Sequence, residues 1–453
     1  MNDVSPAAPR AVVPAALAAS VLAPLNSTMI VVALPTMLSD LGASVTWGSW
    51  IVVSYLVAMA AVQPLGGSLG DRFGRRRMML IGLAGFTLAT ILAAFAPSVE
   101  VLVVARTLQA VTGASAIPNG AAMVRAALQV QRQGRALGAI GAGVVLAAAL
   151  GPPLGGLVTD ALGWRWIFAV NLVVLLPGIL WAARLPRPAS RTDAARFDLA
   201  GAGLVLTVLV AATLAGTLWR VPGVPWTSAP LLGGVAAVGA WALRRHVVRT
   251  AAPVLDFGLF RRRGFLASGL SILCSNLAMY TVLLALPLFL DQRAAWSARE
   301  VGLALAGMSV SMMLFGPIGG AWSDRVGRRG PAVGGASLAA VGLVPLAFVA
   351  PDWGWPLIVL PLVVVGSGVG LASAPVQAAA LHVAGRASAG QAAGLFSTMR
   401  YLGSIVGTAT MAAVLGSTPG DAAFRGLFAG LVVAALAAAL ASTRLPSRGV
   451  LEG

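Results

Sequence analysis

The chain has 453 residues, of which 58% are hydrophobic and 10% are charged, and its mean hydropathy is +0.89. A soluble protein needs charged residues to cover its surface, so this composition argues against soluble domains and indicates a protein of the lipid bilayer. The formal net charge is +17, and all 31 basic residues are arginines. They lie in short segments between apolar runs and not on one face or tail, which argues against nucleic acid as a partner.

Fourteen apolar segments follow one another along the chain, and each can cross a bilayer core of about 30 Å as a helix. They are 12–36, 48–69, 78–96, 101–124, 136–158, 166–183, 199–219, 227–243, 264–290, 301–322, 331–351, 355–380, 389–415 and 426–443. We therefore predict an all-α integral membrane protein with 14 transmembrane helices. The stretch ALAAS at 16–20 is like a cleavage site, but the apolar run before it is too short for a signal peptide, so we expect the first segment to be retained.

The arginines divide unequally between the two sides of the predicted membrane protein. With the N-terminus in the cytoplasm, 24 arginines fall on the cytoplasmic side and 5 on the outer side, while Arg106 and Arg400 lie within segments. Cytoplasmic loops carry the excess of positive charge in membrane proteins. We therefore expect a multi-pass protein of the cell (inner or plasma) membrane, with both termini in the cytoplasm.

Several classes of chemistry are excluded by residues that the chain lacks. Without a lysine it cannot form a P-loop, whose lysine contacts the phosphates. Its one cysteine, Cys274, and two separated histidines, His246 and His382, provide neither a disulfide framework nor a zinc cluster. No pair of carboxylates lies within a segment. We therefore expect no enzyme activity, no metal and no cofactor.

One charged motif occurs twice. GSLGDRFGRRR at 67–77 follows the second segment, and GAWSDRVGRR at 320–329 follows the tenth. Transporters are often built from parallel repeats, and six-helix repeats would place the second copy six helices after the first. Here eight helices separate the copies, so we predict a six-helix bundle at 1–184, an inserted two-helix segment at 185–263 and a second six-helix bundle at 264–453.

The motif order resembles the major facilitator superfamily, in particular its fourteen-helix drug–proton antiporters. Further stretches that resemble this family are LVVARTLQAVTGAS (102–115), ALGPPLGG (149–156), WRWIFAVN (164–171), FDLAG (197–201), PVLDFGLFRRRGF (253–265) and MRYLGSIVG (399–407). The resemblance implies two bundles that work by alternating access. It also implies a latch between them at Gly67, Asp71, Arg72, Gly74, Arg75, Asp324, Arg325, Gly327 and Arg328, and an antiporter motif at Gly151, Pro152, Gly155 and Gly156. GSGVG at 366–370 is like a dinucleotide loop but lies in an apolar segment, so we interpret it as helix packing.

The polar residues within the segments are the candidates for a transport pathway. None of the 14 acidic residues lies within a segment, and Asn26 stands where many family members carry an aspartate. The candidates are Asn26, Thr28, Gln63, Arg106, Gln109, Asn276 and Arg400. One hypothesis is that Arg106 and Arg400 make a central cavity electropositive, which favours acidic or neutral polar substrates. In the alternative, these arginines only bond to carbonyls or amide side chains between helices.

Together these features predict an exporter of drugs or secondary metabolites that acts on a small-molecule substrate as a monomer. Proton antiport is the drive that the resemblance implies, and Asp40, Asp71 and Asp291 at helix ends are the candidate titrating groups. The alternative is an importer or facilitator of small solutes with the same fold and no proton coupling.

Overall fold

The computed structural model describes residues 8–185, 198–217, 225, 227–250, 257–384, 389–415 and 420–446, and these are almost wholly helical. The first bundle contains α1 (Ala8–Asp40), α2 (Val45–Phe73), α3 (Arg75–Ala94), α4 (Val99–Ala127), α5 (Val130–Leu162) and α6 (Trp166–Ala183). A pair follows, α7 (Leu199–Thr217) and α8 (Ser228–Arg249), and then a short 3₁₀ helix, η2 (Phe257–Arg261). The second bundle contains α9 (Arg263–Ala294), α10 (Ala298–Val326), α11 (Arg329–Leu346), α12 (Trp355–Ala384), α13 (Ala389–Leu415) and α14 (Asp421–Ser442).

Each predicted segment coincides with one of these fourteen helices. Among the described residues, ten helices are long and apolar enough to cross a membrane: α1 to α6, α9, α10, α12 and α14. The other four helices do not meet that criterion over their described residues. The all-helical prediction is confirmed, whereas the count of fourteen membrane crossings stays a prediction.

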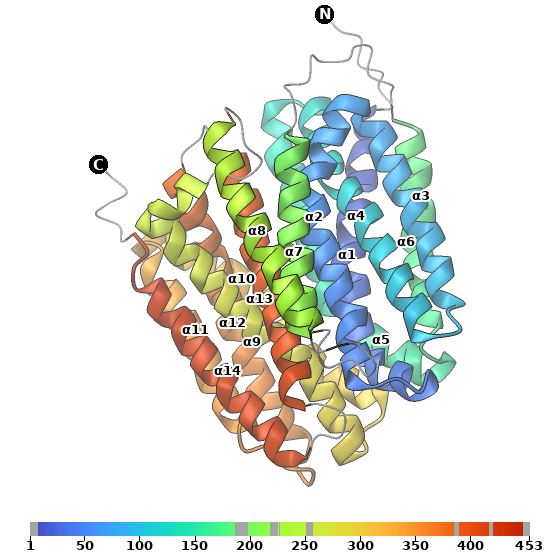
Figure 1. Cartoon of the computed structure of the whole chain (residues 1–453), viewed down its shortest axis with the longest axis vertical. Helices are drawn as coiled ribbons and strands as arrows, with labels where there is room; N and C mark the ends of the chain where they lie inside the picture. Colours follow the sequence, from blue (N-terminus) through green and yellow to red (C-terminus); the bar gives the residue numbers. More distant parts are fainter. Residues whose placement is uncertain are drawn as a thin grey trace, which may run out of the picture.

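The helices pack as two groups that lie side by side (Figure 1). In the first group, α1 packs on α4, α5 and α6, and α4 packs on α2 and α3. In the second, α12 packs on α10 and α11, while α14 and α13 pack on α9. The groups meet where α5 packs on α10 and where α2 packs on α13. These pairs form the seam between the bundles.

The α7–α8 pair lies against one side of the seam (Figure 1). α7 and α8 pack on each other, and α7 contacts both α2 and α13, so the pair bridges the two bundles. The predicted boundaries after residues 184 and 263 stay predictions.

Glycines set the distance between several helices of the second bundle. A Cβ on Gly366 would lie 2.1 Å from the carbonyl oxygen of Met308 on α10, and one on Gly368 would lie 2.4 Å from the amide nitrogen of Ala339 on α11. Both contacts need the absence of a side chain, as at close helix crossings in membranes. The interpretation of GSGVG as packing is therefore confirmed.

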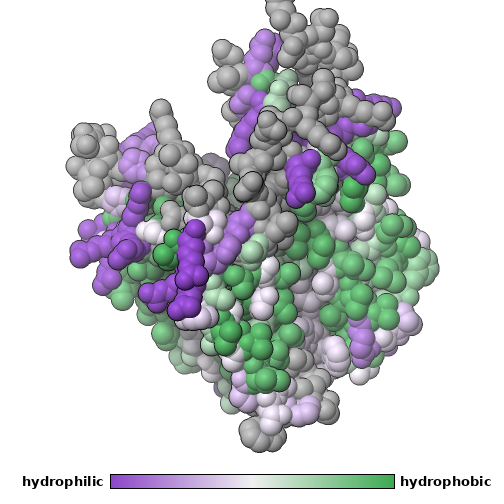
Figure 2. Space-filling view, turned by 45° about the horizontal axis from the view of Figure 1, so that its top comes forward, coloured by the Kyte–Doolittle hydropathy of each residue, from purple (hydrophilic) through white to green (hydrophobic). Residues whose placement is uncertain are grey.

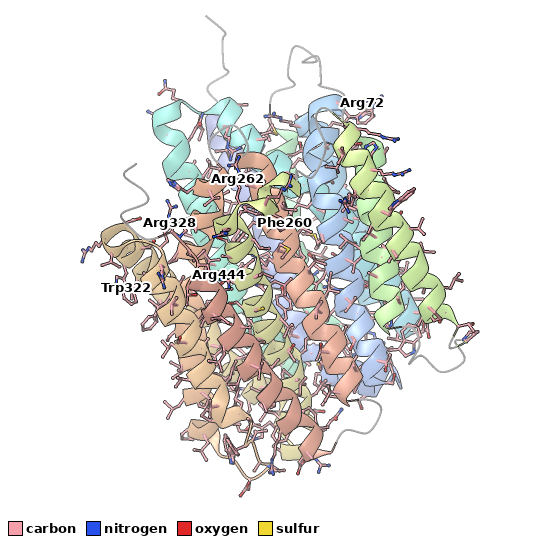
Figure 3. The ribbon with its side chains drawn as sticks, turned by 60° about the vertical axis from the view of Figure 1, so that its left-hand side comes forward. Arg72, Phe260, Arg262, Trp322, Arg328 and Arg444 are labelled. Atoms are coloured by element: carbon pink, nitrogen blue, oxygen red, sulfur yellow. The ribbon has the colours of Figure 1, made fainter. Side chains whose placement is uncertain are left out.

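Charged side chains gather at one end of the molecule. Figure 3 labels Arg72, Arg262, Arg328 and Arg444 there, and Figure 2 shows hydrophilic residues on this end and hydrophobic residues over the flanks below it. We call it the arginine-rich end, and the first and last described residues lie there too (Figure 1). At the opposite end two ion pairs form: Arg165 donates to Asp40 at 2.6 Å, and Arg293 donates to Asp421 at 2.5 Å.

Candidate functional site

Five buried polar side chains from four helices of the first bundle form one hydrogen-bonded cluster, which we call the polar cluster. Its members are Asn26 (α1), Thr90 (α3), Arg106 and Gln109 (α4) and Asn171 (α6). Each is at most 1% exposed. Such groups are costly to bury unless they are bonded, so the cluster fixes how these helices meet.

Gln109 links the polar cluster, because both the oxygen and the nitrogen of its side-chain amide form hydrogen bonds. Its Oε1 accepts from the Arg106 guanidinium at 2.8 Å and from Asn26 Nδ2 at 3.2 Å. Its Nε2 donates to Thr90 Oγ1 at 2.8 Å. Asn26 Oδ1 in turn accepts from Asn171 Nδ2 at 3.0 Å. The Asn26 amide is therefore both a donor and an acceptor, which an ionised aspartate at this position could not be.

Arg106 is a buried cation, and no described carboxylate lies beside it. Its guanidinium carbon lies 4.1 Å above the ring of Tyr55 on α2, a geometry for cation–π attraction. Its Nε has no acceptor within the part of the chain that the structure describes. All acidic residues of the described helices lie within three residues of a helix end. The interior of the bundles therefore carries fixed positive charge without fixed negative charge.

A second group of side chains, around Arg400 on α13, lies on α9 and α13 of the second bundle. The Arg400 guanidinium lies 5.6 Å from the ring of Phe396, and it interacts electrostatically with Tyr401 and with Tyr280 of α9. Tyr280 also interacts with Arg106 of the first bundle. We call Arg400, Tyr401, Tyr280 and Phe396 the arginine–tyrosine group. The two helices that carry this group contact the first bundle, α13 through α2 and α9 through α1.

The remaining predicted pathway residues do not join either group through the hydrogen bonds that the structure describes. Thr28 Oγ1 donates to the Pro24 carbonyl at 2.8 Å on its own helix. Asn276 Nδ2 donates to the Ile272 carbonyl at 3.1 Å, also within its helix. Gln63 is half-buried on α2. Their assignment to a pathway stays a prediction.

The two copies of the latch motif share a backbone turn. Gly74 follows α2 with φ +96°, and Gly327 follows α10 with φ +89°. Each amide donates 2.9 Å back to a carbonyl four residues earlier, in Gly70 and Ser323 respectively. A side chain is disfavoured at such positive φ, so this backbone requires glycine. The duplicated glycine therefore has a physical reason in both bundles.

Two arginines of the first copy of the motif donate hydrogen bonds to carbonyls of the first bundle. Arg75 donates to the Ala122 carbonyl at 3.2 Å, and Arg76 donates to the Ala183 carbonyl at 2.6 Å. Ala183 is the last residue of α6, where carbonyls lack partners within the helix and carry partial negative charge, so Arg76 caps that helix end. The side chain of Asp71 and the surroundings of Gly67 lie outside the described details, and a latch between bundles stays a prediction.

The arginine that follows the aspartate is exposed in both copies. Arg72 of the first copy lies 5.4 Å from the neighbouring ring of Phe73, while Asp324 and Arg325 of the second copy are exposed. Arg328 is half-buried, and burial lowers the pKa of its guanidinium against the raising effect of Asp324.

The antiporter motif joins α5 to helices of both bundles. A Cβ on Gly151 would lie 1.7 Å from Thr28 Oγ1, and one on Gly155 would lie 2.8 Å from the backbone of Met29, both on α1. A Cβ on Gly156 would lie 2.4 Å from the carbonyl oxygen of Ala298 on α10. The motif therefore permits close packing inside the first bundle and across the seam.

The seam is closed at one end and open at the other. Along the face of α5 that carries Gly156, the positions change from buried to exposed toward the arginine-rich end: Gly156, Pro152 and Ala149 are buried, then Val145, Ala142 and Gly138 are exposed. Every 18 residues make five turns of a helix, so Gly138 lies on the same face as Gly156. On α10, Gly302 is buried against α5, whereas a Cβ on Gly316 would meet nothing within 4 Å. The bundles therefore separate toward the arginine-rich end.

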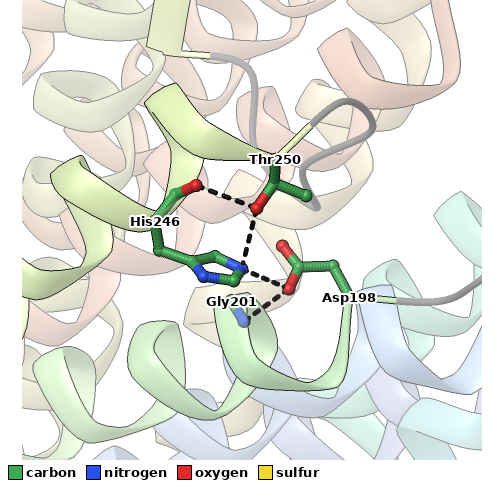
Figure 4. A network of polar contacts seen from close by, with 4 residues as sticks. All are labelled: Asp198, Gly201, His246 and Thr250. Carbon is green, nitrogen blue, oxygen red and sulfur yellow. Dashed lines mark hydrogen bonds and ion pairs between the residues drawn. The ribbon is translucent and has the colours of Figure 1, made fainter.

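The ends of α7 and α8 are tied by a small polar network (Figure 4). Asp198 precedes α7 and accepts from the Gly201 amide at 2.7 Å. The same oxygen lies 2.5 Å from His246 Nε2 on α8, and Thr250 Oγ1 lies 3.2 Å from that nitrogen. This network makes the two helices one unit at the arginine-rich end.

The sequence interpretation missed three residues that the structure joins to the candidates. Thr90 and Asn171 complete the polar cluster, and Tyr55 lies under Arg106. Asn171 ends the stretch WRWIFAVN, so an amide at that place in a family motif was the available signal. Thr90 stands in an ordinary apolar segment and gave none.

Comparison with known proteins places the chain among membrane transporters. The sequence pattern of the Major Facilitator Superfamily matches residues 16–408. The multidrug resistance protein B homolog of Mycobacterium tuberculosis (strain H37Rv) is 31% identical over 413 residues, which cover 88% of this chain and 74% of that protein. The methylenomycin A resistance protein of Streptomyces coelicolor is 31% identical over 410 residues, covering 88% and 84% respectively. A solved structure of a bacterial homologue of the human drug peptide transporters PepT1 and PepT2 superposes with a TM-score of 0.69 over 96% of this chain and 97% of that one, at 16% identity.

Proposed function

Because the chain belongs to the major facilitator superfamily, we propose that it is an efflux transporter that exports small organic molecules by alternating access. It is a multi-pass membrane transporter and not an enzyme. The names of its relatives, which include resistance proteins for several drugs and for methylenomycin A, support export as the direction.

One observation supports alternating access more than any other: the unequal seam. α5 and α10 touch backbone to backbone near Gly156 and Gly302 and diverge toward Gly138 and Gly316. A transporter of this kind exposes its central site to one side of the membrane at a time. In this conformation the central site would open toward the arginine-rich end.

The arginine-rich end is the cytoplasmic end in this proposal, because positive residues gather on that side of membrane proteins. The fourteen helices would then all cross the cell membrane, with both termini in the cytoplasm. The conformation described above would be the one that takes up its substrate from the cytoplasm, as an exporter requires. The chain would work as a monomer.

Proton antiport is the drive that membership of an antiporter family favours. With no carboxylate in the middle of a helix, exchange would have to use an acid at a helix end. Asp40 already accepts from Trp164 Nε1 at 3.0 Å and from Arg165 at 2.6 Å, so its carboxylate is held in its charged form. Asp291, which is exposed near the end of α9, is the better candidate.

Drug susceptibility tests the proposed function. Cells that produce the chain and cells that lack it are compared across acidic, neutral and cationic compounds. Export predicts a raised inhibitory concentration for at least one compound, and this increase should disappear on collapse of the membrane potential and pH gradient. Equal susceptibility across a broad panel, with the protein present in the membrane, would contradict it.

The rival function, uptake or facilitated diffusion, predicts the opposite sign, namely greater sensitivity in producing cells. For the drive, Asp291→Asn is compared with Asp40→Asn in proteoliposomes with an imposed pH gradient. Proton exchange at Asp291 predicts loss of gradient-driven export in the first variant only. Unchanged export in Asp291→Asn would remove that residue from the mechanism.

A further inference from the structure

The arginine–tyrosine group carries an inference about substrate chemistry, and this inference rests on the proposed export function. The chain contains three tyrosines, and all three belong to this region: Tyr55, Tyr280 and Tyr401. They come from α2, α9 and α13, and Tyr55 interacts electrostatically with both of the others. All the phenol groups of the chain therefore lie near two arginines.

This region lies at mid-depth along the helices. With a rise of 1.5 Å per residue, Tyr55 is roughly 15 Å along α2 from its first residue, and Arg400 is roughly 17 Å along α13. Tyr280 is roughly 20 Å from the end of α9. A substrate of an alternating-access transporter binds near the middle of the membrane, between the repeats. The position therefore fits a central binding site.

Part of this region is accessible. Tyr280, Arg400 and Tyr401 are half-buried, whereas Arg106 and Tyr55 are at most 2% exposed. Tyr280 lies on α9, which contacts α1 of the opposite bundle, and its side chain interacts electrostatically with Arg106. The seam is closed at the Gly156 end and open toward the arginine-rich end. The partial exposure of Tyr280, Arg400 and Tyr401, on helices that contact the first bundle, agrees with a position at this opening.

The guanidinium of Arg400 has N–H donors for which the described residues provide no acceptor. In the part of the chain that the structure describes, its guanidinium contacts the Phe396 ring, and no carboxylate or carbonyl oxygen accepts a hydrogen bond from it. A guanidinium has five N–H donors in a planar fork that matches a carboxylate. An arginine at this depth is costly unless a partner balances it, and the acids of the described helices are all near helix ends.

The polar cluster adds the positive charge of Arg106 to that of Arg400, and none of its side chains occupies the Arg400 guanidinium. Arg106 uses its bonds to Gln109 and its contact with Tyr55, and it stays out of reach because it is buried. It therefore acts as a fixed positive charge behind the accessible groups. The aromatic rings of Tyr280 and Tyr401 add flat apolar surface, and their phenols can donate hydrogen bonds.

We propose that Arg400, Tyr280 and Tyr401 form the central substrate site and that this site binds small aromatic weak acids as their anions. Arg400 would bind the acidic group, the phenols would donate to it, and the rings would hold the planar part of the substrate. The site would disfavour organic cations, because two arginines lie there and none of the described carboxylates does. For an anion, the inside-negative membrane potential also acts in the direction of export.

Transport by the full chain in proteoliposomes tests this inference. The probes are 2-naphthoate and (2-naphthyl)methylammonium, which share one ring system and differ in charge. The variants are Arg400→Gln, Arg400→Lys and Tyr401→Phe. The matched control is Arg299→Gln, which removes an exposed arginine from the far end of α10.

The expected result is transport of naphthoate in preference to the ammonium compound. Arg400→Gln removes a hydrogen bond between two charged groups, which contributes to binding. It should therefore lower naphthoate transport roughly 10- to 100-fold at low substrate concentration, chiefly through a higher KM. Arg400→Lys should recover part of this loss, and Tyr401→Phe should lose roughly 2- to 10-fold. Arg299→Gln should match the unmodified protein. Thermal unfolding in detergent checks that each variant is folded.

Two results would overturn the inference. One is faster transport of the ammonium compound than of naphthoate by the unmodified protein. The other is unchanged naphthoate transport in folded Arg400→Gln. Export of cationic or neutral compounds without naphthoate would reject this substrate class and leave the export function standing, whereas failure of every compound in the susceptibility panel would reject both.

Discussion

Gly156 of α5 and Gly302 of α10 meet backbone to backbone across the seam. A Cβ on Gly156 would lie 3.1 Å from the Cα of Gly302, and a Cβ on Gly302 would lie 3.0 Å from the Cα of Gly156. Real Cβ atoms rarely come so near to another backbone, so a side chain at either position has to push the helices apart. This pair therefore determines how closely the two bundles pack at the end opposite the arginine-rich end.

Gly156→Val should prevent this closure. Overpacking of a tight contact costs about 1–3 kcal/mol, which changes the population of the closed seam roughly 10- to 100-fold. We expect export to fall by at least that order. In a Cys274→Ser background, a cysteine at the buried position Leu305 should become reactive to an impermeant maleimide added from outside. Gly430→Val on α14, where a Cβ would meet nothing within 4 Å, is the control. Unchanged labelling would show that the seam does not depend on the glycine.

Gln109→Leu should destabilise the first bundle. The substitution leaves the buried Arg106 and Asn26 donors without their acceptor, and an unsatisfied buried donor costs about 1–3 kcal/mol, more when it is charged. The measurement is the midpoint of thermal unfolding in detergent, which should fall. Thr112→Val is the matched control, because Thr112 is on the same helix and its described side-chain hydrogen bonds go to backbone carbonyls of α4. Equal midpoints for both variants would contradict the assigned role of Gln109.

Asn26→Asp should introduce a titratable group at the polar cluster. The new carboxylate would lie beside Gln109, and Gln109 bonds to Arg106, so the site could exchange a proton near a fixed positive charge. We expect export by this variant to depend more steeply on an imposed pH gradient than export by the parent chain. A pH-sensitive dye inside proteoliposomes measures the proton movement. Identical proton movement in the two proteins would refute a role for position 26 in coupling.

Gly74→Ala and Gly327→Ala should both impair transport if the repeated turns act in conformational change. Each substitution forces a Cβ into a backbone with φ near +90°, at a cost of about 1–3 kcal/mol. Gly163→Ala provides the control, since Gly163 has φ +93° but lies at the opposite end, after α5. The three substitutions thus introduce the same backbone strain, and the control differs only in its location. If Gly163→Ala reduced transport as much as the other two, the loss would reflect general strain and not a latch.

The helices and the paired motifs could be predicted from the sequence because hydropathy and local spacing determine them. Hydropathy identifies only the apolar part of each helix. α5, for example, begins at Val130, although its apolar segment begins at 136. The helix continues beyond the apolar segment, over residues whose hydropathy does not indicate a helix.

The partners of the candidate residues could not be predicted in this way. Arg106 and Gln109 lie three apart on one helix, so their proximity follows from spacing. Asn26 is 83 residues from Gln109, and Asn171 is 145 residues from Asn26. Gly302 belongs to no motif, and its importance appears only when α5 lies against it. Such contacts depend on how bundles dock, which the pattern of a single chain does not specify.

Everted membrane vesicles test the central claim most directly, because in them the cytoplasmic end, which we propose to be the arginine-rich end, faces the medium. Vesicles that contain the chain are energised and supplied with a compound to which the chain gives resistance. The account predicts that the compound accumulates inside, and that vesicles with the Gly156→Val variant accumulate far less. Equal accumulation with and without the chain, or net release of preloaded compound from energised vesicles, would contradict export by alternating access.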